Sequence, residues 1–127
     1  VLTVAAMQRG VAGLVIDGAV RDVAAAAKRG FPVYSHGVCM KAAVKVALGT
    51  LQERIICAGA LVYPGDFVLG DDDGVVVVRP DRAEEVLAAA QAREDAETGV
   101  MERLGQGEVT LDILQLRSKL PADFHRV

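Results

Sequence analysis

Aromatic residues are scarce in this sequence, which has three Phe, two Tyr and no Trp among its 127 residues. Positive charge is not in excess either, since 14 Lys and Arg stand against 17 Asp and Glu, for a formal net charge of −3. Proteins that bind nucleic acid combine basic surfaces with aromatic side chains on which the bases stack. The composition therefore argues against nucleic acid as the main partner.

Long hydrophobic runs and cysteine-rich motifs are also missing. No apolar run approaches the roughly 20 residues that span a bilayer, and the chain does not open like a secretory signal. Cys39 and Cys57 are too few, even with His36 and His125, for the four ligands of a structural zinc site. We expect reduced cysteines in a cytoplasmic protein that does not associate with membranes.

The residues that are present predict one α/β domain over residues 1–127. The first third alternates between helical and strand-like segments, which is typical of α/β folds. Asp17-Gly18 between them is a turn signal, and Asp22 can serve as the N-cap of the second helix. The predicted segments are a helix over 1–9, a buried strand over 11–16, a helix over 23–29 and a strand from 31 to 34.

The middle of the chain predicts closely spaced strands, and the end predicts helices. Residues 44–48 alternate as a half-buried strand does, although a helix over 41–48 is also possible. Tight turns separate the later strands and favour hairpins. Asp81 and Glu84 form a capping-box pattern before a long helix. The remaining predicted elements are strands over 54–58, 60–63, 67–69 and 75–79, a helix over 82–104, and a helix over 111–119 capped by Thr110.

The densest chemistry follows the first strand, where Arg21 and Asp22 stand side by side. Ligands of open α/β folds bind outside the carboxyl ends of strands. Arg21 offers a planar fork for a carboxylate or ketone oxygen, and Asp22 is a hard oxygen ligand suited to Mg²⁺ or Mn²⁺. The alternative is that Asp22 only caps a helix and that Arg21 is only a solvated charge.

Three other groups of charged residues are candidates with simpler alternatives. Asp71-Asp72-Asp73 can be a cation site or a soluble turn. Lys41 and Lys45 can form an anion-attracting patch or a solvated face. Glu97 interrupts the apolar stripe of the long helix, so it either pairs locally with Arg93 or reaches over a neighbouring active site.

Several segments together resemble the aldolases that cleave 4-hydroxy-4-methyl-2-oxoglutarate and 4-carboxy-4-hydroxy-2-oxoadipate, and their relatives, the regulators of ribonuclease E activity. The resemblance covers nearly the whole chain. Its two most specific motifs are GxVxDGxxRD-like, within Gly10–Asp22, and PGDxxxxDxDGVVVV, within 64–78. The other matching segments are Gly30–Tyr34, Val44-Lys45 and Cys57-Ala58-Gly59.

This resemblance implies a swivelling phosphohistidine-domain-like α/β sandwich with a C-terminal helical extension, assembled as a homotrimer or homohexamer. It implies a class II, metal-dependent aldolase in which Asp22 binds a divalent cation and Arg21 contacts the substrate's keto and hydroxyl oxygens. Backbone amides leading into the helix at Val1 and Leu2 would hold the pyruvate carboxylate. Lys45 would lie near the active site, and Glu97 would reach a neighbouring subunit.

The implied reaction releases pyruvate and a second 2-oxo acid from a small 4-hydroxy-2-oxo diacid, with oxaloacetate decarboxylation as a side activity. The regulators of ribonuclease E also carry an Arg-Asp pair, so a non-catalytic, protein-binding function is the alternative. Lys45 and the extension through 107–119 favour the aldolase. Members of the family are longer, and we expect this chain to lack their N-terminal portion, with most of the carboxylate-binding turn.

Overall fold

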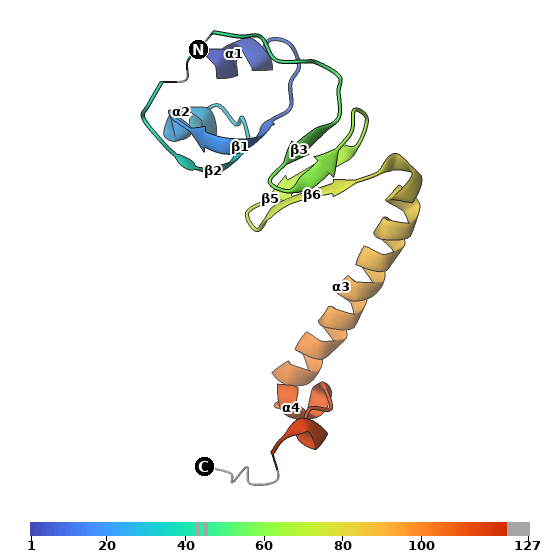
Figure 1. Ribbon diagram of the computed structural model, residues 1–127. Helices are drawn as coiled ribbons and strands as arrows, with labels where there is room; N and C mark the ends of the chain where they lie inside the picture. The colour runs from blue at the N-terminus through green and yellow to red at the C-terminus, as the bar shows by residue number, and fades with distance from the viewer. Residues whose placement is uncertain (43, 45, 122–127) are drawn as a thin grey trace. The chain divides into compact units, whose positions relative to one another are not determined.

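The computed structural model describes residues 1–42, 44 and 46–121, and its contacts divide the chain into two compact units (Figure 1). We call Val1–Pro80 the N-terminal unit and Asp81–Val127 the C-terminal unit. Each unit is described by itself. The predicted single domain over residues 1–127 concerns the family's fold as a whole and stays a prediction.

The N-terminal unit starts with a helix and a parallel strand pair. Helix α1 (Leu2–Met7) lies within the predicted segment 1–9. Strand β1 (Leu14–Val20) pairs in parallel with β2 (Val33–Val38), and α2 (Val23–Lys28) connects them. The predicted α/β pattern of this region is therefore confirmed, although β1 starts and ends several residues later than predicted.

The predicted turn at Asp17-Gly18 is wrong, because both residues lie inside β1. The pairing shifts between Ile16 and Ala19, so that Asp17 and Gly18 together stand opposite the single residue His36. A β-bulge of this kind absorbs an extra residue and re-aims the side chains around it. Asp-Gly is common in turns, but here it forms the bulge and the strand continues beyond it.

Two antiparallel hairpins follow, as the closely spaced strands predict. Strand β3 (Ile55–Cys57) pairs with β4 (Ala60–Val62), and β5 (Phe67–Asp71) pairs with β6 (Gly74–Val78). Asp72 and Asp73 form the turn between β5 and β6, and the Asp71 carboxylate at the end of β5 accepts the backbone N–H groups of Asp73 and Gly74 at 2.9 and 3.2 Å. The Asp71 side chain thus stabilises a tight turn between the strands.

A buried carboxylate fixes the turn before β5. The Asp66 side chain is only 2% exposed, and its Oδ1 lies 3.3 Å from Arg79 Nε. Its Oδ2 accepts the Tyr63 backbone N–H at 2.8 Å. The Arg79 guanidinium also lies 4.5 Å from the centre of the Tyr63 ring, a cation–π contact. These contacts hold the predicted Pro64-Gly65-Asp66 turn against the end of β6.

The predicted strand or helix at 44–48 is wrong for the residues that are described. Val44, Val46 and Leu48 lie outside regular secondary structure and are exposed. Lys45 lies outside the described residues. An alternating pattern becomes a strand only where a neighbouring strand completes its hydrogen bonds, and no described strand pairs with this segment.

The N-terminal unit buries little apolar surface. Among the described residues only Ala26 and Phe31 are buried, at 7% and 5% exposure. Val15 and Ile16 of β1 are 40% and 38% exposed, so the expectation of a buried first strand is wrong for this chain taken alone. Much of the apolar surface of β1, β5 and β6 therefore remains open to solvent or to a partner.

The C-terminal unit is dominated by α3 (Ala83–Gly105), which confirms the helix predicted over 82–104. It follows the 3-10 helix Pro80–Arg82, and its N-cap is Arg82 with no side-chain cap bond. The helix therefore begins one residue later than the capping-box pattern of Asp81 and Glu84 predicts. No side chain of α3 is buried, so its apolar stripe is not covered within the described residues.

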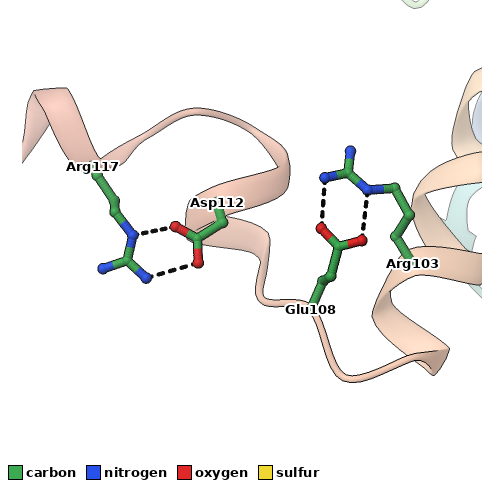
Figure 2. A network of polar contacts seen from close by, with 4 residues as sticks. All are labelled: Arg103, Glu108, Asp112 and Arg117. Atoms are coloured by element: carbon green, nitrogen blue, oxygen red, sulfur yellow. Dashed lines mark hydrogen bonds and ion pairs between the residues drawn. The ribbon is translucent and has the colours of Figure 1, made fainter.

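Two arginine–carboxylate pairs order the end of this unit (Figure 2). Arg103 donates from Nε and Nη2 to Glu108 at 3.0 and 2.6 Å, and Arg117 donates to both carboxylate oxygens of Asp112. In place of the helix predicted over 111–119, the chain forms α4 (Thr110–Ile113) and a 3-10 turn at Arg117–Lys119. Thr110 is the first residue of α4 and not its cap.

The structure thus confirms a mixed α/β chain with small sheets and a C-terminal helix. No helix in the described part of the chain is long and apolar enough to cross a membrane. Cys39 and Cys57 are both free, as expected.

Candidate active site

The Arg-Asp pair lies directly after the carboxyl end of β1, where α/β folds bind ligands. Arg21 Nε is 4.0 Å from Asp22 Oδ2, and the two side chains are 57% and 75% exposed. Asp22 occupies the N-cap position of α2, but its side chain makes no cap hydrogen bond. The predicted capping role is therefore wrong, and the carboxylate is accessible to a ligand.

The backbone of Asp22 is left-handed, with φ 61° and ψ 32°. Few residues other than Gly, Asn and Asp adopt this conformation, which costs most L-residues roughly 1–2 kcal/mol. Strained residues of this kind cluster at binding sites, where the surrounding structure holds them. The conformation turns the chain sharply between β1 and α2 and leaves both charged side chains at the strand end.

The donor set at this strand end is the single exposed carboxylate of Asp22. No group of three or more His, Cys, Asp or Glu side chains that could hold a metal lies within residues 1–42, 44 and 46–121. A single exposed carboxylate does not meet the needs of zinc, which takes three or four protein ligands. Mg²⁺ commonly binds through one or two carboxylates and retains several waters.

A second polar cluster at the bulge of β1 was not singled out from the sequence. Asp17 Oδ1 lies 3.0 Å from His36 Nδ1 on the neighbouring strand, and Asp17 Oδ2 accepts the Ala58 backbone N–H at 2.9 Å. The signal available in the sequence was Asp-Gly in an apolar strand, which also marks bulges. The pairing with His36 depends on strand register, which local sequence does not reveal.

The other predicted site residues are distributed over the chain. Val1 precedes α1 and is fully exposed, and Leu2 is the first residue of that helix. Lys45 lies outside the described residues. Glu97 belongs to the C-terminal unit, where its Oε1 accepts a hydrogen bond from Arg93 Nε at 2.8 Å and its side chain is 60% exposed. The structure thus brings together Arg21 and Asp22 and shows the local pairing of Glu97.

Residues 1–77 match a protein family described as RraA-like, Aldolase/RraA. The chain belongs to this family. The match covers most of the N-terminal unit, including the Arg-Asp pair and both hairpins. It confirms the resemblance that the sequence motifs indicate.

Two other proteins share more than a third of their aligned residues with this chain. An uncharacterized protein of Methanocaldococcus jannaschii is 36% identical over 85% of this chain and 52% of its own length. A protein of Halalkalibacterium halodurans named "Putative 4-hydroxy-4-methyl-2-oxoglutarate aldolase" is 38% identical over 67% of this chain and 40% of its own. The chain thus spans about half the length of these relatives or less.

A solved structure supports the fold. The crystal structure of an uncharacterized protein from Pseudomonas syringae matches 85% of this chain and 55% of that chain, with a TM-score of 0.73 and 30% identity. The family's α/β architecture is therefore shared by this chain. The narrower assignment to a swivelling phosphohistidine-domain-like sandwich stays a prediction.

Proposed function

We propose that this chain carries the catalytic strand end of a class II, metal-dependent aldolase. The substrate is a 4-hydroxy-2-oxo diacid, the products are pyruvate and a second 2-oxo acid, and oxaloacetate decarboxylation is a side activity. The observation that carries the proposal is the accessible Arg21–Asp22 pair, held after β1 by the left-handed backbone of Asp22. The name of the Halalkalibacterium halodurans relative supports the same chemistry.

The two side chains have complementary roles. Arg21 donates hydrogen bonds to the substrate's keto oxygen and stabilises the negative charge that develops there as the carbon–carbon bond breaks. Asp22 holds Mg²⁺ or Mn²⁺, which when bound supplies Lewis-acid polarisation of that oxygen. Positive charge at the site then offsets the acidic balance of the chain and attracts an anionic substrate.

The remaining assignments rest on the family resemblance. Val1 and Leu2 bind the pyruvate carboxylate through their backbone, and Lys45 lies near the substrate. Glu97 reaches a neighbouring subunit of a homotrimer or homohexamer in the cytoplasm, and it exchanges its partner Arg93 for that contact.

Pyruvate release tests this proposal directly. The protein is incubated with 4-hydroxy-4-methyl-2-oxoglutarate or oxaloacetate, with Mg²⁺ or with a chelator, and pyruvate is measured by a coupled dehydrogenase. Asp22→Asn keeps a residue that tolerates the left-handed backbone and removes the charge. We expect kcat/KM to fall about 100-fold or more. Asp72→Asn, in the exposed turn between β5 and β6, removes an equal charge and serves as the control.

The results of these assays distinguish the metal role of Asp22, its place in the site and the lyase assignment itself. Release that survives the chelator contradicts the metal role of Asp22, and equal rates for both variants contradict its place in the site. The family description names RraA beside aldolase. Absence of release by the unaltered protein contradicts the lyase assignment and favours the non-catalytic regulator, which a binding assay with ribonuclease E then tests.

A further inference from the structure

The bulge in β1 places an acid and an imidazole side by side. Asp17 and Gly18 together stand opposite His36, and Asp17 Oδ1 lies 3.0 Å from His36 Nδ1. Bulges are frequent beside active sites, where they re-aim a side chain. The Asp17 and His36 side chains are 43% and 69% exposed, so the pair is accessible to solvent.

A third element fixes the carboxylate of this pair. Asp17 Oδ2 accepts the backbone N–H of Ala58 at 2.9 Å. Ala58 has a φ of 49° and forms the two-residue loop of the β3–β4 hairpin with Gly59, at φ 82°. A left-handed alanine costs roughly 1 kcal/mol or more and persists only where its surroundings hold it. Both oxygens of Asp17 are thus engaged, which orients the side chain.

We propose that His36 is a proton-transfer residue of the aldolase reaction, oriented by Asp17; this inference rests on the proposed function. A carboxylate beside Nδ1 favours the neutral tautomer in which Nδ1 carries the proton and Nε2 keeps its lone pair. Nε2 then serves as the base. Asp17 acts through the imidazole and is a positioning residue.

The Asp17–His36 pair spans β1 and β2, and the Arg-Asp motif directly follows β1. Arg21 is the third residue after Gly18 along the chain. At about 3.3 Å per extended residue, Arg21 lies within roughly 10 Å of Gly18 along the chain. The proposal thus places proton transfer on β2, opposite the bulge, and charge stabilisation just after the end of β1, its parallel neighbour.

Proton transfer through His36 accounts for every proton and electron pair of the carbon–carbon cleavage without a further reactant. The Nε2 lone pair takes the proton of the C4 hydroxyl, and the O–H electrons form the C4 carbonyl as the C3–C4 bond breaks. The electrons of that bond form a C2–C3 double bond, and the C2 carbonyl electrons move onto its oxygen, beside Arg21. The imidazolium then returns its proton to C3, which gives pyruvate and restores neutral His36.

Substitution and chemical rescue test this role in the full chain. In His36→Ala we expect kcat to fall about 100-fold with little change in KM, because general acid–base catalysis contributes 100-fold or more. Millimolar imidazole should restore at least about a tenth of the lost rate, since the site is open. His125→Asn, which changes the other histidine of the sequence, is the control and should retain full activity.

The outcomes separate this inference from the proposed function. An unchanged kcat in His36→Ala, with activity lost in Asp22→Asn, overturns the role of His36 alone. Loss of activity without rescue by imidazole makes His36 a structural residue and also overturns the proposal. No pyruvate release by the unaltered protein overturns the proposed function and the inference with it.

Nitrogen NMR tests the Asp17–His36 contact without depending on enzymatic activity. With ¹⁵N-labelled histidine, the His125→Asn protein has one imidazole, so its two nitrogen signals belong to His36. We expect the neutral ring to carry its proton on Nδ1, and Asp17→Asn to abolish that preference. A ring protonated on Nε2, or one unaffected by Asp17→Asn, shows that the contact is an ordinary surface ion pair and overturns the proposal.

Discussion

At the residue scale, Asp22 contributes to folding through its backbone conformation and to the proposed chemistry through its carboxylate. Its φ of 61° suits Gly, Asn and Asp but strains residues with larger or branched Cβ substituents. The carboxylate itself makes no cap hydrogen bond. Folding therefore needs the left-handed turn at this position, and ligand binding needs the charge.

This separation predicts opposite effects of two substitutions. Asp22→Gly should leave the free energy of unfolding unchanged or raise it slightly, whereas Asp22→Val should lower it by about 1–2 kcal/mol. Urea unfolding followed by circular dichroism measures both. Equal stability of the two variants would show that the left-handed conformation is absent in solution. Both variants should lack pyruvate release, since neither keeps a metal ligand.

At the element scale, the sequence predicted those helices and strands whose formation depends on local residues. The strands before the long helix were predictable because short segments of turn-forming residues mark their ends, such as Pro64-Gly65-Asp66 and the acids before Gly74. The long helix was predictable from composition over its whole length. Residues 44–48 failed because alternation is local, whereas a strand needs a partner that the described residues do not supply.

The same reasoning explains what was missed at the site. Arg21 and Asp22 are neighbours in sequence, so their association with a strand end needed no tertiary information. Asp17 and His36 meet only because two parallel strands pair with a shifted register. Register depends on the packing of whole strands, and a search for local motifs does not detect it.

The start of α3 carries an ion pair that makes the helix sensitive to acid. Arg82 donates from Nε and Nη2 to Glu85 at 2.6 and 2.7 Å. These hydrogen bonds, and then the opposite charge, hold the pKa of Glu85 below its ordinary value. A lowered pKa in the folded state stabilises the fold above the ordinary glutamate pKa. That contribution is lost as the pH falls through the lowered value.

We therefore expect the helical circular dichroism signal at 222 nm to fall as the pH drops below the ordinary glutamate range. Glu85→Gln should reduce the helix signal at neutral pH and shrink this acid-dependent step, because it removes the charge that pairs with Arg82 and favours a helix N-terminus. Glu84→Gln removes a charge from the same turn but leaves the Arg82–Glu85 pair. A step of the same size in both variants would contradict the assignment to Glu85.

At the scale of the whole molecule, the amount of buried surface is the deciding quantity. Among its described residues the N-terminal unit has two buried apolar side chains, Ala26 and Phe31. Burial of apolar surface is the main force that opposes the loss of chain entropy, at about 25 cal/mol per Å². A unit of this size with so little core does not reach the stability of an ordinary domain on its own. Its exposed apolar strands therefore need a partner surface.

We propose that a second copy of the chain supplies that surface and predict a stable oligomer at micromolar concentration. The exposed apolar side chains of β5 and β6 include Val68, Leu69 and Val76, at 49%, 56% and 55% exposure. Light scattering after size-exclusion chromatography should give a mass that is a multiple of the 13.4 kDa chain. Because assembly and folding are then linked, the Tm should fall on dilution.

Leu69→Lys should weaken assembly, whereas Asp72→Lys, which also adds positive charge in this hairpin, should not. A monomer that unfolds cooperatively with a Tm independent of concentration would contradict the prediction, because the core of one copy would then suffice.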